Sequence, residues 1–385
     1  MKIINRILVT VSAFTLVAGS VFAPDSFAQD PDFYIFLAFG QSNMDGAGRI
    51  EEQDRTVDSR FKVMYAADND GNRKKGTWAT AVPPLCRGSS SLCPADYFGR
   101  TLVDSLPSNI KIGIINVSIP GTKIELFVKD SYQSYLSGLS SGDQYIKNIS
   151  NTSYGGNPSG RLIEMAKLAQ KDGVIKGFLM HQGESNPNDN QWTRKVKSIY
   201  DNFITELGLN ASETPLLAGE LLYKNQKGAC GAFNAQYIDT LYKVIPNAHA
   251  ISADSLEGVD SFHFTSASYR KFGKRYADTM LTILKNQATS VAERKKAIYG
   301  SKMERNLKMN VYGNSITFEI PEQRHVTLKA YTLQGNLIST IAGSRFSAGE
   351  HTLTYNQNKV PSGVFLLRLD AEGSVTTKAI IAKQR

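Results

Sequence analysis

A continuous apolar run at residues 33–39 limits the fold of this chain more than any other segment. Its sequence, FYIFLAF, has no charged residue, which is typical of a strand buried on both faces of a sheet. Comparable runs lie at 111–117, 174–180, 215–222 and 248–253, and we expect each to form a strand. Burial of both faces requires covering layers on both sides of the sheet.

Helical patterns alternate with these runs. The segments 159–170, 192–207 and 266–284 place apolar residues at helical spacing. Gly173 is the expected C-cap of the first helix, and Ser266 is the expected N-cap of the last. Alternating strands and helices predict an α/β fold with a parallel central sheet in a three-layer α/β/α arrangement.

The amino-terminal segment has the pattern of a secretory signal peptide. Lys2 and Arg6 precede an apolar stretch at residues 7–23, and small residues follow at Ser26 and Ala28. A membrane anchor is the alternative, but the stretch is short for a span and polar residues interrupt it. We therefore predict a secreted protein, extracellular or at the cell surface, with no transmembrane span.

Composition changes along the chain and predicts a domain division. Residues 1–28 form the signal peptide, and 29–285 carry the strand–helix alternation. Residues 286–304 are polar and are expected to be a linker, with a partly helical linker as the alternative. Residues 305–385 contain six short β-rich runs separated by turn residues, which predicts a small all-β sandwich.

The three cysteines leave two interpretations open. Cys86 and Cys93 are close in sequence, so they are compatible with a small disulfide ring in an oxidising compartment or with two free thiols. Cys230 is the unpaired third. None has the spacing of a metal site, and we predict no metal and no cofactor.

The motif Gly40-Gln41-Ser42-Asn43 follows the first buried run directly. Gly40 permits a sharp turn and removes side-chain bulk beside Ser42. Ser42 is therefore expected at the carboxyl edge of the sheet, where open α/β sheets bind their ligands. A simple turn is the alternative for this motif taken alone.

A serine nucleophile needs a base, and His263 is the best candidate among five histidines. Asp260 stands three residues earlier, so its carboxylate can accept from one ring nitrogen while the other faces Ser42. Glu184, in the block HQGESN that follows the third run, is a second candidate for the acid. His181, at the end of that run, is expected to be a structural polar residue.

The oxyanion hole is expected from the same sheet edge. The candidate donors are the backbone N–H groups of Ser42 and Gly121 and the side-chain amide of Gln182. Each of these residues follows a different predicted strand.

At these blocks the chain resembles the SGNH (GDSL-like) hydrolase superfamily. It is most similar to the sialate O-acetylesterase-like branch, which includes the carbohydrate esterase family six acetyl xylan esterases. FGQSNM at 39–44, HQGESN at 181–186 and DSFHF at 260–264 match in order and spacing. The resemblance implies an SGNH fold, with Ser42 as nucleophile, His263 as base, and Glu184 or Asp260 as the acid.

The carboxyl-terminal region is similar to the sorting domains of type IX secretion substrates. The resemblance lies in residues 328–341, an SAGEH turn at 347–351, a VPSGVF segment at 360–365 and a final strand with basic residues. It implies the outer-membrane secretion machinery as a partner. A carbohydrate-binding β-sandwich is the alternative.

The predicted function is that of a secreted serine esterase that removes O-acetyl groups from plant cell-wall polysaccharide, with acetyl xylan as the favoured substrate. Sialate or pectin O-deacetylation and non-catalytic glycan binding are the alternatives. The formal net charge is +9, but residues 29–285 hold nearly equal numbers of basic and acidic residues. The excess lies in the linker and tail, so we predict an acetylated polysaccharide or oligosaccharide as partner and no nucleic acid.

Overall fold

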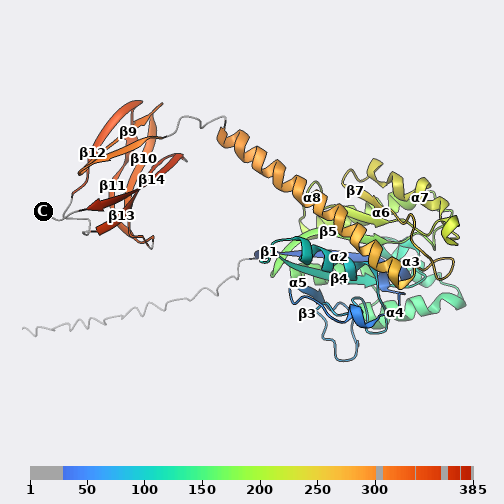
Figure 1. Cartoon of the computed structure of the whole chain (residues 1–385). Coiled ribbons are helices and arrows are strands. Elements are labelled where there is room, and N and C mark those ends of the chain that lie inside the picture. The colour runs from blue at the N-terminus through green and yellow to red at the C-terminus, as the bar shows by residue number, and fades with distance from the viewer. Residues whose placement is uncertain (1–28, 301–306, 334, 357–362, 373, 383–385) are drawn as a thin grey trace, which may run out of the picture. The chain divides into compact units, whose positions relative to one another are not determined.

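The computed structural model describes residues 29–300, 307–333, 335–356, 363–372 and 374–382 (Figure 1). The predicted signal peptide, the last residues of the predicted linker and the turn at 361–362 lie outside this set. The chain divides into two compact units, with the boundary in the sequence between Leu284 and Lys285. Within the described residues, no helix combines the length and apolar character needed to cross a membrane.

The first unit contains seven strands and eight α-helices among the described residues. The strands are β1 (Asp30–Gly40), β2 (Phe61–Met64), β3 (Trp78–Thr80), β4 (Lys111–Ser118), β5 (Gly173–His181), β6 (Leu216–Gly219) and β7 (Ala248–Ile251). The α-helices are α1 (Ser42–Asp45), α2 (Pro94–Ser105), α3 (Tyr132–Ser137), α4 (Gln144–Tyr154), α5 (Pro158–Ala169), α6 (Trp192–Leu207), α7 (Ala232–Gln236) and α8 (Ser266–Gly300). Short 3-10 helices lie at η1 (Glu52–Asp54), η2 (Ile124–Phe127), η3 (Ser141–Asp143), η4 (Lys224–Gln226) and η5 (Ile238–Lys243).

The seven strands form one sheet in the order β3-β2-β4-β1-β5-β6-β7. All neighbours are parallel except the edge pair β2 and β3. The apolar run predicted as the first strand is the centre of this sheet, with Leu37 paired to Ile115 of β4 and Phe178 of β5.

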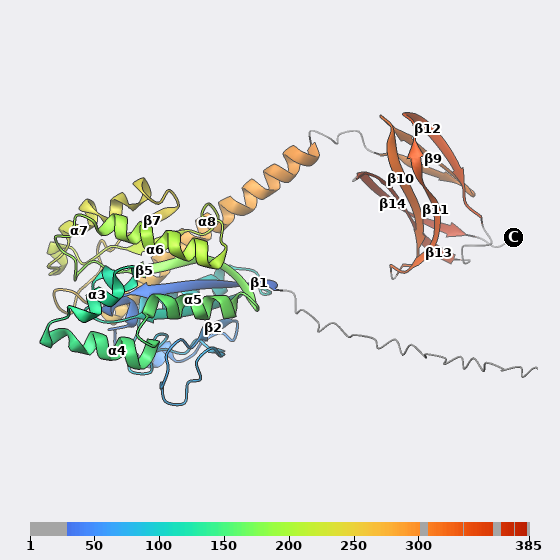
Figure 2. The ribbon, with the colours of Figure 1, turned by 180° about the vertical axis from the view of Figure 1, so that it is seen from behind.

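The central strand contributes side chains to two separate cores. Ile35, Leu37 and Phe39 pack with residues of α5 and α6, whereas Phe36 and Ala38 pack with residues of α2 and α8. The two opposite views show helices on both faces of the sheet (Figures 1 and 2). The predicted three-layer α/β/α arrangement is confirmed, because both faces of β1 are buried as its apolar run required.

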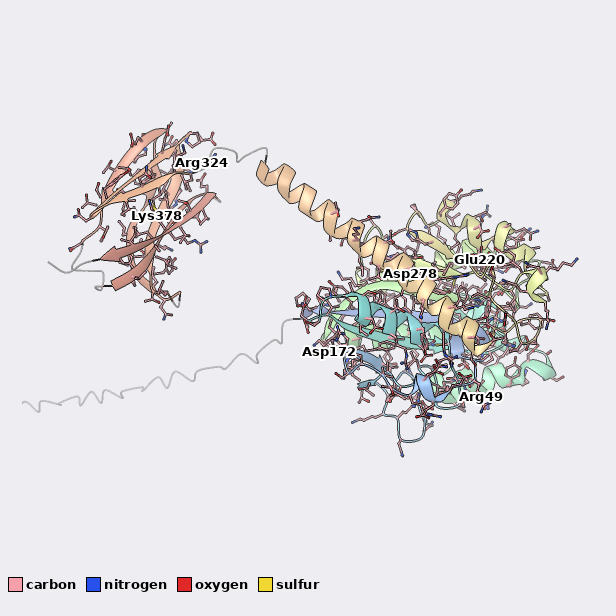
Figure 3. All side chains as sticks on the ribbon, viewed as in Figure 1. Arg49, Asp172, Glu220, Asp278, Arg324 and Lys378 are labelled. Atoms are coloured by element: carbon pink, nitrogen blue, oxygen red, sulfur yellow. The ribbon has the colours of Figure 1, made fainter. Side chains whose placement is uncertain are left out.

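Two short strands were not expected from the sequence. β2 has four residues and β3 three, too few for a reliable pattern. Trp78 of β3 reaches across β4 at Gly113, where a Cβ would lie 2.7 Å from the indole ring. Its Nε1 donates to Asp172 at 2.9 Å, near the amino end of the sheet (Figure 3). Long-range packing therefore stabilises this edge.

Two predicted helix ends are wrong. Gly173 is the first residue of β5, and α5 ends at Ala169 with Gln170 as its C-cap. Ser266 lies inside α8, and the cap is Thr265, whose Oγ1 accepts from the N–H of Ser268 at 3.1 Å. Helix α8 also continues to Gly300, well into the segment expected to be a linker.

The cysteines are thiols in this structure. Cys86 and Cys93 are both free and buried, and Cys230 is free and half-buried. Burial raises the pKa of each thiol. The structure therefore agrees with the interpretation of Cys86 and Cys93 as two free thiols, and not with a disulfide between them.

The second unit consists of antiparallel strands. They are β8 (Met309–Tyr312), β9 (Ser315–Ile320), β10 (Arg324–Tyr331), β11 (Leu337–Phe346), β12 (Gly349–Thr354), β13 (Gly363–Ala371) and β14 (Ser374–Ala382). They form a four-stranded sheet, β11-β10-β13-β14, and a three-stranded sheet, β12-β9-β8. Alternate residues such as Phe318, Leu328 and Leu367 fill the core of this unit. The predicted all-β region is confirmed, with β8 as an addition.

We predict that Gly99→Ala destabilises the protein by about 1–3 kcal/mol, the usual cost of overpacking. A Cβ at Gly99 in α2 would lie 2.0 Å from the ring of Phe61 in β2, so the helix would have to move away from the sheet. Urea unfolding of wild type and variant measures this. Asp104→Ala, at an exposed position on the same helix, is the control and should change stability by less than about 0.5 kcal/mol. Equal stability of the Gly99→Ala protein would contradict the packing argument.

Candidate active site

Ser42 is the first residue of α1 and follows the end of β1 by two residues. The turn before it is held by both neighbouring strands. The N–H of Ile119 donates to the carbonyl of Gly40 at 3.2 Å, and the N–H of Gln41 donates to the carbonyl of His181 at 3.0 Å. The central position of β1 therefore places Ser42 between the segments that follow β4 and β5.

Gly40 is required by a close backbone approach. A Cβ at this position would lie 2.1 Å from the carbonyl oxygen of His181, and the φ of Gly40 is +152°. A side chain here would push β5 away from the nucleophile turn, so the predicted role of Gly40 has a direct steric basis.

Ser42, His263 and Asp260 form a hydrogen-bonded chain. The Nε2 of His263 lies 2.9 Å from the Oγ of Ser42, and its Nδ1 lies 2.8 Å from the Oδ2 of Asp260. His263 and Ser42 are partly exposed, so the pair is open to a substrate. The structure thus brings Ser42 next to a histidine loop that lies more than 200 positions later in the sequence.

The loop that carries the histidine is organised by the other oxygen of Asp260. Its Oδ1 accepts from the N–H groups of Phe262 and His263, both at 2.7 Å. Burial alone would raise the pKa of Asp260, but the hydrogen bonds from His263 and these two N–H groups prevail and lower it. Asp260 is therefore an ionised partner for the histidine, which fixes the ring tautomer with its Nε2 free to take a proton from Ser42.

Glu184, the second acid candidate, has a different environment. Its carboxyl group is buried, with Oε1 accepting from the Nδ2 of Asn43 at 2.6 Å and lying 3.5 Å from the Nδ1 of His181. Burial raises the pKa of Glu184 to about 7, although Asn43 and the charge of His263 act in the opposite direction. No hydrogen bond joins Glu184 to His263 in the described residues, whereas Asp260 is hydrogen-bonded to the ring of His263.

His181 is a buried structural residue in this arrangement. Burial lowers the pKa of His181 to about 4, so the ring is neutral at pH 7. Its Nε2 lies 3.1 Å from the carbonyl oxygen of Glu220, which requires the proton on Nε2 and leaves Nδ1 as an acceptor facing Glu184. This agrees with the expectation that His181 is a structural polar residue.

Asn43 joins the three blocks of the site, a role that the sequence did not predict. Its side chain is fully buried, and its Nδ2 donates to Glu184 and to the carbonyl of Phe262 at 2.9 Å. Its Oδ1 accepts from the hydroxyl of Tyr269 in α8. One amide therefore links the nucleophile helix, the segment after β5 and the histidine loop. The only signal in the sequence was its place directly after Ser42.

The backbone N–H groups of Ser42 and Gly121 are available to an oxyanion. Among the described residues, neither donates a hydrogen bond within the protein. Buried or half-buried N–H groups are nearly always paired, so two open ones beside a nucleophile are a natural site for a developing negative charge. Gly121 has a φ of +67°, which orients this turn.

The Gln182 amide is turned toward the protein interior. Its Nε2 lies 2.7 Å from the Oδ1 of Asn186 and 3.2 Å from both the Oε1 of Gln41 and the carbonyl of Thr122. Its Oε1 accepts from the indole of Trp192 at 2.6 Å. These contacts bind the segments after β1, β4 and β5 together. A direct role of Gln182 in the oxyanion hole stays a prediction.

Asn186 anchors residues 121–125, which we call the oxyanion segment, to the end of β5. Its Oδ1 also accepts from the N–H of Ile124 at 2.9 Å, and its Nδ2 donates to Glu125 at 3.0 Å. Lys195 from α6 pairs with Glu125 at 2.7 Å and with Asp189 at 2.6 Å. This network holds the turn that contains Gly121 in place.

A buried ion pair anchors α1, the helix that begins with Ser42. Both oxygens of Asp45 in α1 accept from the guanidinium of Arg87, at 2.8 and 2.9 Å. Burial raises the pKa of Asp45 to about 6 even though Arg87 opposes this shift. Asn116 of β4 adds a hydrogen bond to the carbonyl of Met44 at 2.7 Å. The helix that begins with Ser42 is therefore attached to two other elements.

The described residues contain no group of three or more histidine, cysteine, aspartate or glutamate side chains suited to hold a metal ion. What they do contain is a serine within reach of a base, a base oriented by an acid, and two open N–H groups. This set can perform nucleophilic attack on a carbonyl and stabilise the resulting oxyanion.

Comparisons with known proteins match one family model and several solved structures. The model of a family described as carbohydrate esterase, sialic acid-specific acetylesterase, matches residues 32–282. Similar solved structures include a protein from Arabidopsis thaliana, with 19% identity over 66% of this chain and 99% of that chain and a TM-score of 0.49. NanS has 16% identity with the same coverages and TM-score. XAC1771, a carbohydrate acetylesterase from Xanthomonas citri, has 14% identity over 89% and 80% of the two chains and a TM-score of 0.42.

We predict that Asp260→Asn lowers kcat by about 10⁴, the loss expected when the acid of a Ser-His-Asp arrangement cannot hold the correct tautomer. Glu184→Gln should lower kcat far less, by about tenfold or less, because Glu184 makes no contact with His263. Steady-state kinetics on p-nitrophenyl acetate measure both. A larger loss for Glu184→Gln than for Asp260→Asn would reverse the assignment of the acid.

We also predict that Glu184 makes the protein less stable as the pH rises through about 7. The native state holds its proton more tightly than the unfolded chain, whose glutamate pKa is near 4.5. The stabilisation is complete below about pH 4.5 and is lost as the pH rises through about 7. From pH 5 to pH 8, wild type should lose on the order of 3 kcal/mol relative to Glu184→Gln in urea unfolding.

The matched control for this experiment is Glu125→Gln. Although burial opposes it, the hydrogen bonds from Lys195 and Asn186 lower the pKa of Glu125, which is ionised in both states above pH 5. Its stability curve should run parallel to that of wild type from pH 5 to pH 8. A Glu184→Gln curve that is also parallel would refute the buried proton.

Proposed function

The chain belongs to the family of carbohydrate esterases described as sialic acid-specific acetylesterases, and we propose that it removes O-acetyl groups from plant cell-wall polysaccharide, with acetylated xylan as its substrate. It is thus a carbohydrate acetylesterase, a carboxylic ester hydrolase. The hydrogen-bonded chain from Ser42 through His263 to Asp260 is the observation that supports the proposed mechanism.

The first half-reaction transfers the acetyl group to the enzyme. The Oγ of Ser42 attacks the acetyl carbonyl carbon while the Nε2 of His263 takes the hydroxyl proton. Asp260 stabilises the imidazolium that forms. The N–H groups of Ser42 and Gly121 receive the oxyanion, whose charge exists only near the transition state.

The second half-reaction releases acetate. Collapse of the tetrahedral intermediate breaks the bond to the sugar oxygen, which leaves with the proton from His263. Water then attacks the acetyl-enzyme, and His263 takes a proton from that water. The new carbon–oxygen bond completes acetate, and Ser42 leaves with the proton that His263 returns.

Charge supports an uncharged glycan as substrate. The α/β region holds nearly equal numbers of basic and acidic residues, so it has no overall field to attract an acidic polymer. The sequence blocks that resemble the carbohydrate esterase family six acetyl xylan esterases support the same substrate.

Sialate O-acetylesterase activity is the second candidate, and the description of the matching family favours it. An acidic sugar would need a cation near Ser42. Of the described cations, Lys123 is part of the oxyanion segment, since it lies two residues after Gly121.

Export is the remaining part of the proposal. The amino-terminal segment with its charged start and apolar stretch supports secretion. The resemblance of the second unit to type IX sorting domains supports passage through the outer-membrane machinery of that pathway.

We predict that Ser42→Ala loses acetate release from acetylated xylan by a factor of at least about 10⁴, because Ser42 is the one hydroxyl among the described residues that is hydrogen-bonded to His263. Acetate is measured enzymatically, with p-nitrophenyl acetate as a second substrate. Ser105→Ala, at an exposed serine that ends α2, is the control and should keep most activity. Survival of activity in Ser42→Ala would exclude the mechanism. Acetate release from O-acetylated sialic acid but not from acetylated xylan would make O-acetylated sialic acid the substrate in place of acetylated xylan.

A further inference from the structure

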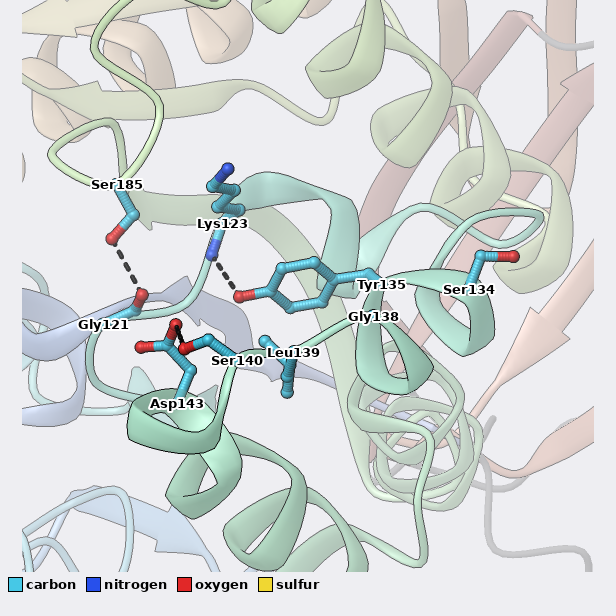
Figure 4. A pocket seen from close by; sticks show the side chains of 9 residues that line it. All are labelled: Gly121, Lys123, Ser134, Tyr135, Gly138, Leu139, Ser140, Asp143 and Ser185. Carbon is cyan, nitrogen blue, oxygen red and sulfur yellow. Dashed lines mark hydrogen bonds between the residues drawn. The ribbon is translucent and has the colours of Figure 1, made fainter.

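A polar cavity of about 430 Å³ lies beside the proposed oxyanion hole (Figure 4). Its size falls within the range of about 300–1,000 Å³ that small-molecule sites occupy. Its lining residues come from the segment after β4, from α3 and the loop after it, and from the segment after β5: Gly121, Lys123, Ser134, Tyr135, Gly138, Leu139, Ser140, Asp143 and Ser185.

Two hydrogen bonds connect the cavity wall to the catalytic segments. The Oγ of Ser185 donates to the carbonyl of Gly121 at 2.9 Å, and the N–H of Ser185 donates to the Oε1 of Gln41 at 3.3 Å. Gly121 supplies a proposed oxyanion N–H, and Gln41 directly precedes Ser42. The cavity is therefore next to the place where the ester carbonyl must lie.

Two tyrosine hydroxyls lie close to residues 121–123, and one of these tyrosines, Tyr135, lines the cavity. The hydroxyl of Tyr135 accepts from the N–H of Lys123 at 3.0 Å (Figure 4). The hydroxyl of Tyr145 lies over Gly121, where a Cβ would come within 2.0 Å of it. A side chain at position 121 would therefore clash with Tyr145, so this close approach requires glycine.

The lining does not suit the acetyl group. An acetyl methyl is small and apolar, whereas the cavity is far larger and offers Leu139 as its one apolar side chain besides the tyrosine ring. Serine hydroxyls, a tyrosine, an amine and a carboxylate instead suit a molecule with many hydroxyl groups. The cavity therefore fits the alcohol side of the ester.

The charges of the lining favour an uncharged ligand. Lys123 and Asp143 give one positive and one negative group, so the cavity has no net charge. The Oδ2 of Asp143 accepts from the Oγ of Ser140 at 2.6 Å. Its Oδ1 accepts from no described residue and is open to a ligand hydroxyl. A sugar carboxylate would be attracted by Lys123 but repelled by Asp143.

We propose that this cavity is a subsite for an uncharged sugar residue on the leaving-alcohol side of the ester. The sugar hydroxyls bind to Asp143, Lys123 and the serines of the wall. This inference rests on the proposed function and adds to it the place where the glycan binds. It explains how an enzyme that transfers only an acetyl group recognises a carbohydrate.

The first experiment fills part of the cavity with a bulky side chain at position 134. Ser134 is an exposed residue of α3 that lines the cavity, and Ser137 is an exposed residue of the same helix that does not. Ser134→Trp should raise the KM for an acetylated xylo-oligosaccharide by about tenfold or more. By contrast, kcat/KM for methyl acetate, whose leaving alcohol is too small to fill the cavity, should change by less than about twofold. Ser137→Trp should match wild type on both substrates.

Binding is measured separately from deacetylation. Xylo-oligosaccharide without acetyl groups should inhibit hydrolysis of p-nitrophenyl acetate competitively in wild type and in Ser137→Trp, and about tenfold more weakly in Ser134→Trp. Asp143→Asn, which keeps the size of the side chain, should also weaken this inhibition several-fold. Free N-acetylneuraminic acid should inhibit more weakly than the neutral oligosaccharide.

The outcomes separate the two proposals. Competitive inhibition that Ser134→Trp weakens supports the subsite even if wild type releases no acetate from acetylated xylan, a result that would overturn only the proposed substrate. Equal inhibition of wild type and Ser134→Trp, or stronger inhibition by N-acetylneuraminic acid, would overturn the subsite as proposed. An equal loss of kcat/KM for both substrates in Ser134→Trp would show that the substitution acts on the catalytic groups. That result would also overturn the proposed subsite.

Discussion

The contact between Gly40 and the backbone of His181 is the constraint on which the site depends. Two neighbouring parallel strands end at the same edge of the sheet, and the absence of a side chain at Gly40 lets their last residues touch. The N–H of Gln41 then donates to the carbonyl of His181, so the turn that carries Ser42 is fixed relative to the block that follows β5. A wider separation would break the buried links from Asn43 and Gln41 to that block.

The two acids of the site differ because their surroundings differ. Asp260 is partly exposed and receives three hydrogen bonds, so it stays ionised beside His263. Glu184 is buried beside the neutral ring of His181, and burial raises its pKa to about 7. One carboxylate therefore orients the base, while the other stabilises the interior through Asn43. A serine esterase needs the first function for catalysis and the second to keep its three segments together.

Polar networks make the oxyanion segment rigid on one side and leave it open on the other. Asn186 and Gln182 hold residues 122–125 from the interior, where each amide is satisfied. Gly121 and Lys123 of the same segment line the polar cavity. This arrangement lets one short loop contribute to both the chemical step and the proposed recognition of the sugar.

The sequence alone determined the layered α/β fold, the all-β second unit and the identity of Ser42, His263 and Asp260 as candidates, because apolar periodicity and short motifs are local properties. It did not determine β2 and β3, which are too short to show a period, or the cap of α8, where two adjacent residues were both suitable. Only the tertiary structure shows that His263 is hydrogen-bonded to Asp260 and not to Glu184, and it reveals the central place of Asn43. Hydrogen bonding and burial join residues such as Asn43 and Tyr269 that are 226 positions apart, and no local pattern encodes that distance.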